Sequence, residues 1–376
     1  MVITGTPSLL ARQSLSVTLD RTMRPQIRPA RLRILSLTAS AAIAASLLPF
    51  GCQRKSASEP PAPDVPPSET SSSPPVGGTD TGNVRSSPGA AKTAAPAEIW
   101  KLFSGEKAFE EVRKQVELGP RPAGSTELEK ARVLITEGLQ RHGWDVQRQE
   151  FTDDTPRGPV KFCNLIGRFS AGKKRPAPAN IQRAIVCSHF DTKRYSTIKF
   201  LGANDAGSST GALIELARVL ALDPRLAEQI ELVFFDGEEA FSQFTETDGL
   251  YGSRHYALDL RKSGRAPQFK FGILWDMIGE KDLTITLSPD SPKELARGIL
   301  ATAESLALRN HFSFFSSAIW DDHVPLNRVK IPTINLIDFD FLYWHTADDT
   351  LDKLAPESLQ KIGAITLKYL HEQLPR

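Results

Sequence analysis

Apolar and polar residues follow helical spacing in several stretches from residue 98 onward. The spacing of Phe109, Val112 and Val116 predicts a helix that stops at Gly119. A second amphipathic stretch, capped by Ser or Thr at its start and ended by glycine, is predicted over residues 125–143. Further helices are predicted near residues 207–221, 249–263, 291–306 and 355–371.

Short apolar runs between these helices predict strands. The candidates are Asn164–Phe169, Ala184–Ser188, Leu232–Phe235, Gly272–Trp275 and Pro332–Ile337. Because strands alternate with helices, the expected fold is α/β, with a mixed, mostly parallel twisted central sheet and helices on both faces. In such a sheet the ligand site lies at the carboxyl ends of the strands.

Residues 1–52 have the composition of a targeting segment. They hold six arginines and a single acid, and residues 34–50 form an apolar run that is short for a bilayer span. The sequence around Cys52 resembles a bacterial lipoprotein cleavage site. Three outcomes remain open: lipidation of Cys52, simple secretion, and an uncleaved anchor. The start of the chain, Met1 or Met23, is also left open. Each alternative places the folded domain in the cell envelope, either periplasmic or secreted, with membrane attachment in two of them.

A linker and a single folded domain are predicted after this segment. Residues 53–97 hold nine of the 27 prolines and no aromatic residue, which predicts a disordered linker. Residues 98–376 then form one catalytic domain, and no oligomerisation signature stands out, so a monomer is expected. The domain is mildly acidic, which argues against nucleic acid as a partner. A disulfide between Cys163 and Cys187 is left open.

Acids and histidines gather where the predicted strands end. They are His189, Asp191, Asp205, Asp236, Glu238, Glu239, Asp276 and His345. Such carboxylates repel one another unless a cation lies among them, and Zn²⁺ accepts both imidazole nitrogen and carboxylate oxygen. The alternative is a set of helix caps and surface turns. The adjacent Glu238 and Glu239 favour the metal site, because one can bind the metal while the other acts on the substrate as an acid or base.

Four segments of the chain resemble glutaminyl cyclases, which share the zinc aminopeptidase-like (M28) α/β fold. These segments are Phe234–Phe241, Leu250–His255, Asp321–Pro325 and Trp344–Asp349. The resemblance covers the chain from about residue 98 to its end. It implies an enzyme that converts the N-terminal Gln of a peptide or protein to pyroglutamate and releases ammonia.

The resemblance also implies a role for individual residues. The ligands of one zinc ion would be Asp205, Glu239 and His345. The other implied roles are a proton shuttle at Glu238, an acidic network of Asp276 and Asp321, and a substrate pocket at Trp344, Phe341 and Trp320. Two departures from the animal enzymes concern this pocket, where Phe244 replaces a Trp and Trp320 replaces a polar residue. Different preferences for the residues that follow Gln are therefore expected.

Two other functions remain open on the sequence. A two-zinc aminopeptidase of the same fold would use the matching ligands His189 and Asp276, Glu239 and His345, with Asp205 bridging and Glu238 activating water. A binding module without catalysis is the third hypothesis, which the presence of Glu238 disfavours. Zinc stoichiometry separates the first two, since two ions per chain would count against the cyclase.

Overall fold

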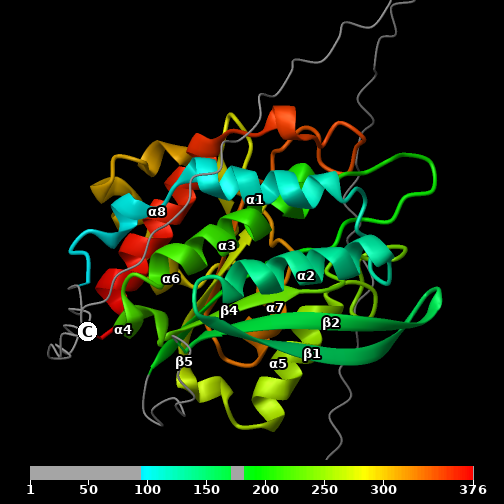
Figure 1. Cartoon of the computed structure of the whole chain (residues 1–376), viewed down its shortest axis with the longest axis horizontal. Helices are drawn as coiled ribbons and strands as arrows, with labels where there is room; N and C mark the ends of the chain where they lie inside the picture. The colour runs from blue at the N-terminus through cyan, green and yellow to red at the C-terminus, as the bar shows by residue number, and fades with distance from the viewer. Residues whose placement is uncertain (1–94, 171–181, 376) are drawn as a thin grey trace, which may run out of the picture. The chain divides into compact units, whose positions relative to one another are not determined.

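The computed structural model describes residues 95–170 and 182–375, which are built around a six-stranded sheet (Figure 1). The strands lie in the order β1-β2-β4-β3-β5-β8. They span Trp144–Thr155 (β1), Gly158–Phe169 (β2), Arg183–His189 (β3), Ile230–Phe235 (β4), Phe269–Asp276 (β5) and Thr333–Ile337 (β8). A second sheet pairs β6 (Ile285–Leu287) with β7 (Phe312–Phe314).

The large sheet is mixed, as predicted. β3 runs parallel to β4 and β5, and β5 runs parallel to β8. β2 joins the sheet antiparallel to β4, and β1 pairs antiparallel with β2. The antiparallel hairpin thus extends one side of a parallel core, and the predicted fold class is confirmed.

Helices cover both faces of this sheet (Figure 1). They are α1 (Gly105–Glu117), α2 (Thr126–Gln140), α3 (Ser209–Leu220), α4 (Pro224–Ala227), α5 (Tyr251–Lys262), α6 (Lys293–Ser305), α7 (His323–Arg328) and α8 (Pro356–Gln373). The predicted cap of the second helix is present, because the Ser125 side chain accepts a hydrogen bond from the Leu128 N–H.

The side chains of β4 show how the two faces divide. Leu232 and Phe234 belong to the larger core, which the helices α1, α2, α3 and α8 cover. Val233 and Phe235 point the other way, into a core that α5 and α7 complete. All four side chains are fully buried, so this strand is a continuous apolar run. It ends directly before the Asp236–Glu239 segment.

Several features differ from the sequence-based expectation or lie outside it. β1 and the first half of β2 were not predicted as strands. Cys163 and Cys187 are free thiols, because β4 lies between the strands that carry them. The predicted targeting segment and most of the predicted linker lie outside the described residues. None of the described helices is long and apolar enough to cross a membrane.

Candidate metal centre and active site

The parallel strands bring the predicted site residues to one edge of the sheet. β3 ends at His189, β5 ends at Asp276, and Glu238 and Glu239 follow the end of β4. His345 lies in the loop after β8, which runs parallel to β5. Because parallel strands end at the same edge, side chains from distant parts of the sequence meet there.

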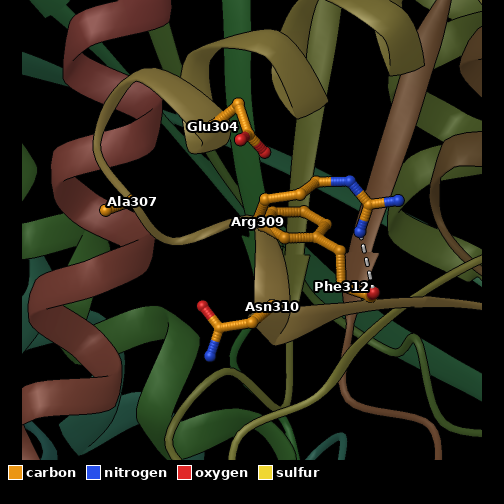
Figure 2. Close-up of a pocket in the computed structure, with 5 residues that line it drawn as sticks. All are labelled: Glu304, Ala307, Arg309, Asn310 and Phe312. Atoms are coloured by element: carbon orange, nitrogen blue, oxygen red, sulfur yellow. Dashed lines mark hydrogen bonds between the residues drawn. The ribbon is translucent and has the colours of Figure 1, made fainter.

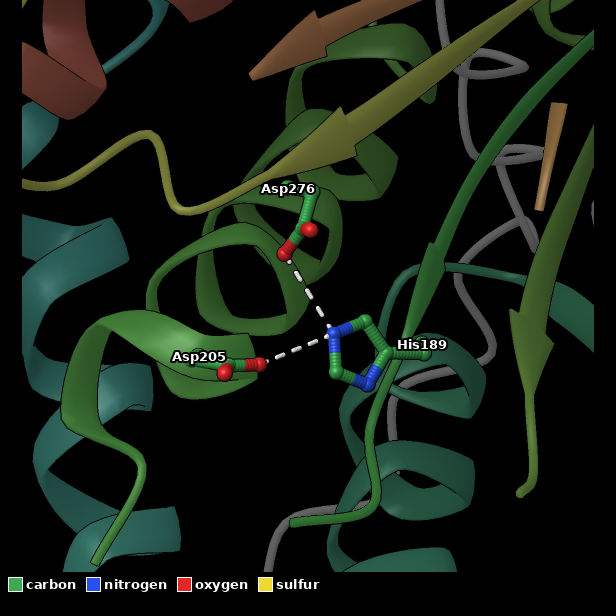
Figure 3. A group of neighbouring side chains, drawn as sticks. All are labelled: His189, Asp205 and Asp276. Atoms are coloured by element: carbon green, nitrogen blue, oxygen red, sulfur yellow. Dashed lines mark hydrogen bonds and ion pairs between the residues drawn. The ribbon is translucent and has the colours of Figure 1, made fainter. Parts of the chain in front are cut away.

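Two overlapping groups of side chains at this edge could hold a metal ion. Ligand atoms of Asp205, Glu239 and His345 lie within 4.8 Å of one another, and so do those of His189, Asp205 and Asp276 (Figure 3). Among residues 95–170 and 182–375 these are the groups with such spacing. The first group is the ligand set that the resemblance implies. Both groups together are the set of the two-zinc alternative.

Asp205 occupies the centre of this arrangement. Its Oδ1 lies 3.2 Å from His189 Nε2, and its Oδ2 lies 3.3 Å from His345 Nε2. His345 Nε2 is also 3.1 Å from Glu239 Oε1, and His189 Nε2 is 3.3 Å from Asp276 Oδ1. One carboxylate therefore faces both imidazoles, with one oxygen directed to each.

The donor atoms of the first group fit a zinc ion. Zn²⁺ binds imidazole nitrogen and carboxylate oxygen, and catalytic zinc sites use three protein ligands and keep a further position open. Asp205 and Glu239 are only 3% and 5% exposed, so their carboxylates are held together away from water. Carboxylates in such a position need a cation among them. The residues present therefore suit a divalent metal of this kind.

The same carboxylates dominate the electrostatics of the two histidines. Burial by itself would lower the pKa of His345, but hydrogen bonds with Asp205 and Glu239 outweigh it and raise the pKa to about 10. Burial also opposes the charged form of His189, yet the carboxylates around it raise its pKa well above the usual value. The carboxylates of the site therefore strongly stabilise a positive charge at the position of both imidazoles.

The pKa values of two acids in this region, Asp276 and Glu238, are also raised, which for an acid favours the neutral form. Burial raises the pKa of Asp276 to about 7, and the charge of Asp321 contributes to that rise. Burial also raises the pKa of Glu238 well above its usual range, with the charges of Glu239 and Asp321 adding to the effect. Carboxyl groups whose pKa is raised by their surroundings are suited to proton transfer.

The backbone that carries Asp205 is fixed by a residue far along the chain. The Asp349 carboxylate accepts hydrogen bonds from the N–H groups of Asn204 (2.7 Å) and Asp205 (3.1 Å). Gly202 has φ 54°, and a Cβ at this position would lie 2.0 Å from the carbonyl oxygen of Asp205. The turn before Asp205 therefore requires glycine.

Asp191 performs the same task for the adjacent glutamates. Its buried carboxylate accepts hydrogen bonds from the N–H groups of Glu238 (3.1 Å) and Glu239 (3.3 Å). Its Oδ1 also lies 3.5 Å from His189 Nδ1. Asp191 is thus placed to orient both glutamates and the imidazole of His189. Partners of this kind behind metal ligands commonly tune metal affinity.

The predicted acidic network involves a further polar residue. Asp321 is 2% exposed, and its Oδ2 accepts a hydrogen bond from Asn335 Nδ2 at 2.6 Å. Its Oδ1 accepts the N–H of Asp322. Asp236, also among the strand-end acids, lies apart from the ligand groups, since its Oδ2 binds Arg132 and the Cys163 N–H, both at 2.6 Å.

The three residues predicted for the substrate pocket differ in exposure. Trp344 is 44% exposed and stacks on the His345 ring with centroids 4.2 Å apart. Trp320 is also exposed at the surface. Phe341 is buried against Met277, Ile319 and Ile337, so its ring packs in the interior and supports the loop that follows β8. The two tryptophans therefore expose ring surface that a substrate can contact.

A separate hollow lies at the end of α6. It has a volume of about 440 Å³ and is lined by Glu304, Ala307, Arg309, Asn310 and Phe312 (Figure 2). Arg309 Nη1 donates a hydrogen bond to the Phe312 carbonyl at 3.0 Å, which occupies part of its polar surface. None of these residues belongs to the metal groups, so we place the chemistry at the strand ends.

Sequence reasoning missed two residues that contact the ligands or their backbone. Asp349 is the last residue of the Trp344–Asp349 segment, and its sequence pattern indicates no role for its carboxylate. Lys193 places its Nζ 3.3 Å from Glu239 Oε2, and its side chain is largely buried. A lysine two residues after the His-Phe-Asp sequence was an available signal, because a buried lysine needs an acidic partner.

A mixed sheet with two carboxylate–imidazole groups at its parallel strand ends defines the zinc aminopeptidase-like class. The model of peptidase family M28 matches residues 164–370. A glutaminyl-peptide cyclotransferase of Drosophila melanogaster is 30% identical over 68% of this chain and 77% of its own length. The chain belongs to peptidase family M28 and groups there with the glutaminyl-peptide cyclotransferases.

Solved structures agree with this assignment. The glutaminyl cyclase of an Acidobacteriales bacterium is 31% identical, with a TM-score of 0.65 over 77% of this chain and 98% of that one. A Zn-dependent exopeptidase from Parabacteroides distasonis is 26% identical, with a TM-score of 0.64 over 72% of this chain and 99% of that one. The expected family and fold are thereby confirmed.

Proposed function

We propose that this chain converts the N-terminal glutamine of peptides and proteins to pyroglutamate and releases ammonia. The carrying observation is the pair Glu238–Glu239, in which Glu239 joins Asp205 and His345 in a ligand group while Glu238 remains beside it. The likeness to cyclotransferases named for this reaction supports the proposal.

The reaction consumes no water, but a proton has to move from the attacking amine to the leaving nitrogen. The substrate's α-amine attacks the γ-amide carbon, a C–N bond to the amine forms, the C–N bond to the amide nitrogen breaks, and ammonia leaves. A zinc ion held by Asp205, Glu239 and His345 would polarise the γ-carbonyl as a Lewis acid. Glu238 takes the proton that the amine loses and delivers it to the leaving nitrogen, a transfer that typically contributes about 10²–10⁴-fold.

The neighbouring side chains prepare this transfer. The charge of Asp321 acts on both Glu238 and Asp276, which makes these three the acidic network of the proposal, and Asp191 orients the Glu238 backbone. The exposed Trp344 beside His345 covers the substrate side chain and keeps water from the reacting amide. Holding the amine against the carbonyl lowers the entropic barrier of ring closure.

The second candidate function is a two-zinc aminopeptidase. The group of His189, Asp205 and Asp276 favours it, because Asp205 offers one oxygen to each histidine. In that enzyme Glu238 would activate water. We propose one zinc per chain. Metal analysis of the purified protein that gives two tightly held zinc ions would favour the aminopeptidase.

The role of Glu238 is tested with the variant Glu238→Gln on a Gln-initiated peptide. The wild-type product should lose the mass of one ammonia, and the variant should be at least ~100-fold slower with unchanged zinc content. Turnover by the variant within a few fold of wild type would remove Glu238 from the proton-transfer role.

We also propose that the enzyme works in the cell envelope, periplasmic or secreted, with a lipid on Cys52. The basic and apolar composition of residues 1–52 supports this localisation. The substitution Cys52→Ser should move the protein from the membrane fraction to the soluble fraction. An unchanged distribution would exclude a lipid anchor at Cys52.

A further inference from the structure

Two exposed aromatic side chains stand on the loops that hold the acids of the site. Phe244 is 36% exposed and lies in the loop after Glu239. Lys193 connects its ring to the ligands, since its Nζ lies 5.1 Å from the Phe244 ring centroid and 3.3 Å from Glu239 Oε2. Trp320 is 39% exposed and directly precedes the buried Asp321.

Arg328, on α7, joins these two loops. Its guanidinium forms a bidentate ion pair with Glu246, with both N–O distances 2.9 Å. The same guanidinium lies over the Trp320 ring, 4.9 Å from its centroid. Glu246 belongs to the loop that carries Phe244. One arginine therefore contacts both loops through charge and ring stacking.

The loop that carries Glu246 and Phe244 has its own internal supports. The buried Asp248 carboxylate accepts the N–H groups of Phe241 and Ser242, each at 2.8 Å. A Cβ at Gly249 would lie 2.7 Å from Phe244 Cδ1, so the ring packs directly on this glycine. Because these contacts hold the loop together, fixing the position of Glu246 also restricts the movement of Phe244.

We propose that Arg328 is a positioning residue that fixes Trp320 against the Phe244 loop, so that the two rings form opposite walls for the residues after the N-terminal Gln. The inference rests on the proposed function and names a determinant of its specificity. Trp320 and Phe244 would contact the peptide beyond the reacting residue, because both are exposed and neither is a ligand.

Because the ion pair between Arg328 and Glu246 is exposed, its effect on substrate binding should depend on salt concentration. The Arg328 and Glu246 side chains are 50% and 67% exposed, so their attraction is screened by salt. An isolated exposed ion pair contributes little, but a bidentate pair that also stacks on a ring restricts that ring. Affinity for longer substrates should therefore weaken as ionic strength rises.

The test compares Arg328→Ala with wild type in the full-length protein, using a Gln-Gly dipeptide and a Gln-initiated hexapeptide. We expect the KM of the hexapeptide to rise about two- to fivefold, the size of an exposed cation–π contact, with kcat and the dipeptide KM unchanged. Raising the salt should raise the hexapeptide KM of the wild type and leave that of the variant unchanged. Arg328→Lys keeps the charge without the planar fork and should give an intermediate KM.

Arg309→Ala is the matched control, because Arg309 also lies over an exposed phenylalanine, Phe314, at 5.6 Å, away from the metal groups. It should leave both KM values unchanged. A fall in kcat for Arg328→Ala, an equal change for both substrates or no change would overturn the inference. Wild-type turnover of the dipeptide reports the proposed function separately, so its absence would mean that the cyclase proposal itself has failed.

Discussion

Replacing Asp191 with Asn tests whether the buried carboxylate behind the glutamates controls the metal centre. The carboxylate accepts the N–H groups of Glu238 and Glu239, and an amide can accept only through its single oxygen. Its NH₂ group would then face a backbone N–H. Losing a hydrogen bond to a charged group in a buried place costs about 1.5–3 kcal/mol of unfolding free energy.

The affinity for zinc should fall in addition to this loss of stability, because Asp191 also orients the backbone of the ligand Glu239. Partners that orient metal ligands typically contribute about 10–100-fold in metal affinity. We therefore expect the zinc dissociation constant of Asp191→Asn to rise by that factor. Competition with a chromophoric chelator measures it, and chemical denaturation measures the unfolding free energy of the same preparation.

Asp248→Asn supplies the matched control. Asp248 is also buried and also accepts consecutive N–H groups, those of Phe241, Ser242 and Gln243, together with the Tyr251 hydroxyl, but none of these residues is a ligand. This variant should lose at least as much stability and keep its zinc affinity. If Asp191→Asn loses stability like the control and keeps wild-type zinc affinity, the orienting role of Asp191 is refuted.

Two further predictions concern a ligand and a buried acid. His345→Ala should lose bound zinc on purification, and near-normal zinc by metal analysis would refute its assignment as a ligand. Burial, a hydrogen bond with Asp340 and the charge of Glu280 raise the pKa of Asp338 from 3.8 to about 9. The folded protein therefore keeps a proton that the unfolded chain releases, and stability from this group is complete below about pH 4 and falls as pH rises toward 9. Asp338→Asn keeps a hydrogen-bond donor at this position and has no proton to lose. Its Tm should therefore exceed that of the wild type at pH 8 and match it at low pH. Equal Tm values at pH 8 would contradict the protonation of Asp338 in the folded protein.

The parallel core of the fold could be predicted because its strands are buried on both faces. β4 reads as an uninterrupted apolar run, and its residues divide between two cores only once helices cover both sides. β1 could not be predicted in this way. It is an edge strand with many exposed polar residues, and it depends on pairing with β2 rather than on its own apolar pattern.

The site could be predicted in part for a similar reason. The rule that ligands bind at the ends of parallel strands predicted that acids and histidines from distant segments meet at one edge, and the resemblance selected Asp205, Glu239 and His345 among them as ligands. The contact from Asp349 to the Asn204 backbone spans 145 residues and involves only a backbone donor, so no side-chain pattern reveals it. The burial of Phe341 beneath its loop also required the packed structure.

Product analysis of two peptides tests the central claim most directly. The purified full-length protein, loaded with zinc, is given a Gln-initiated and a Leu-initiated peptide in parallel, and ammonia and free amino acids are quantified. We predict one ammonia for each Gln peptide consumed, a product shortened by no residue, and no reaction with the Leu peptide. Release of free Leu or Gln would contradict the cyclase and identify an aminopeptidase with a second zinc at His189 and Asp276.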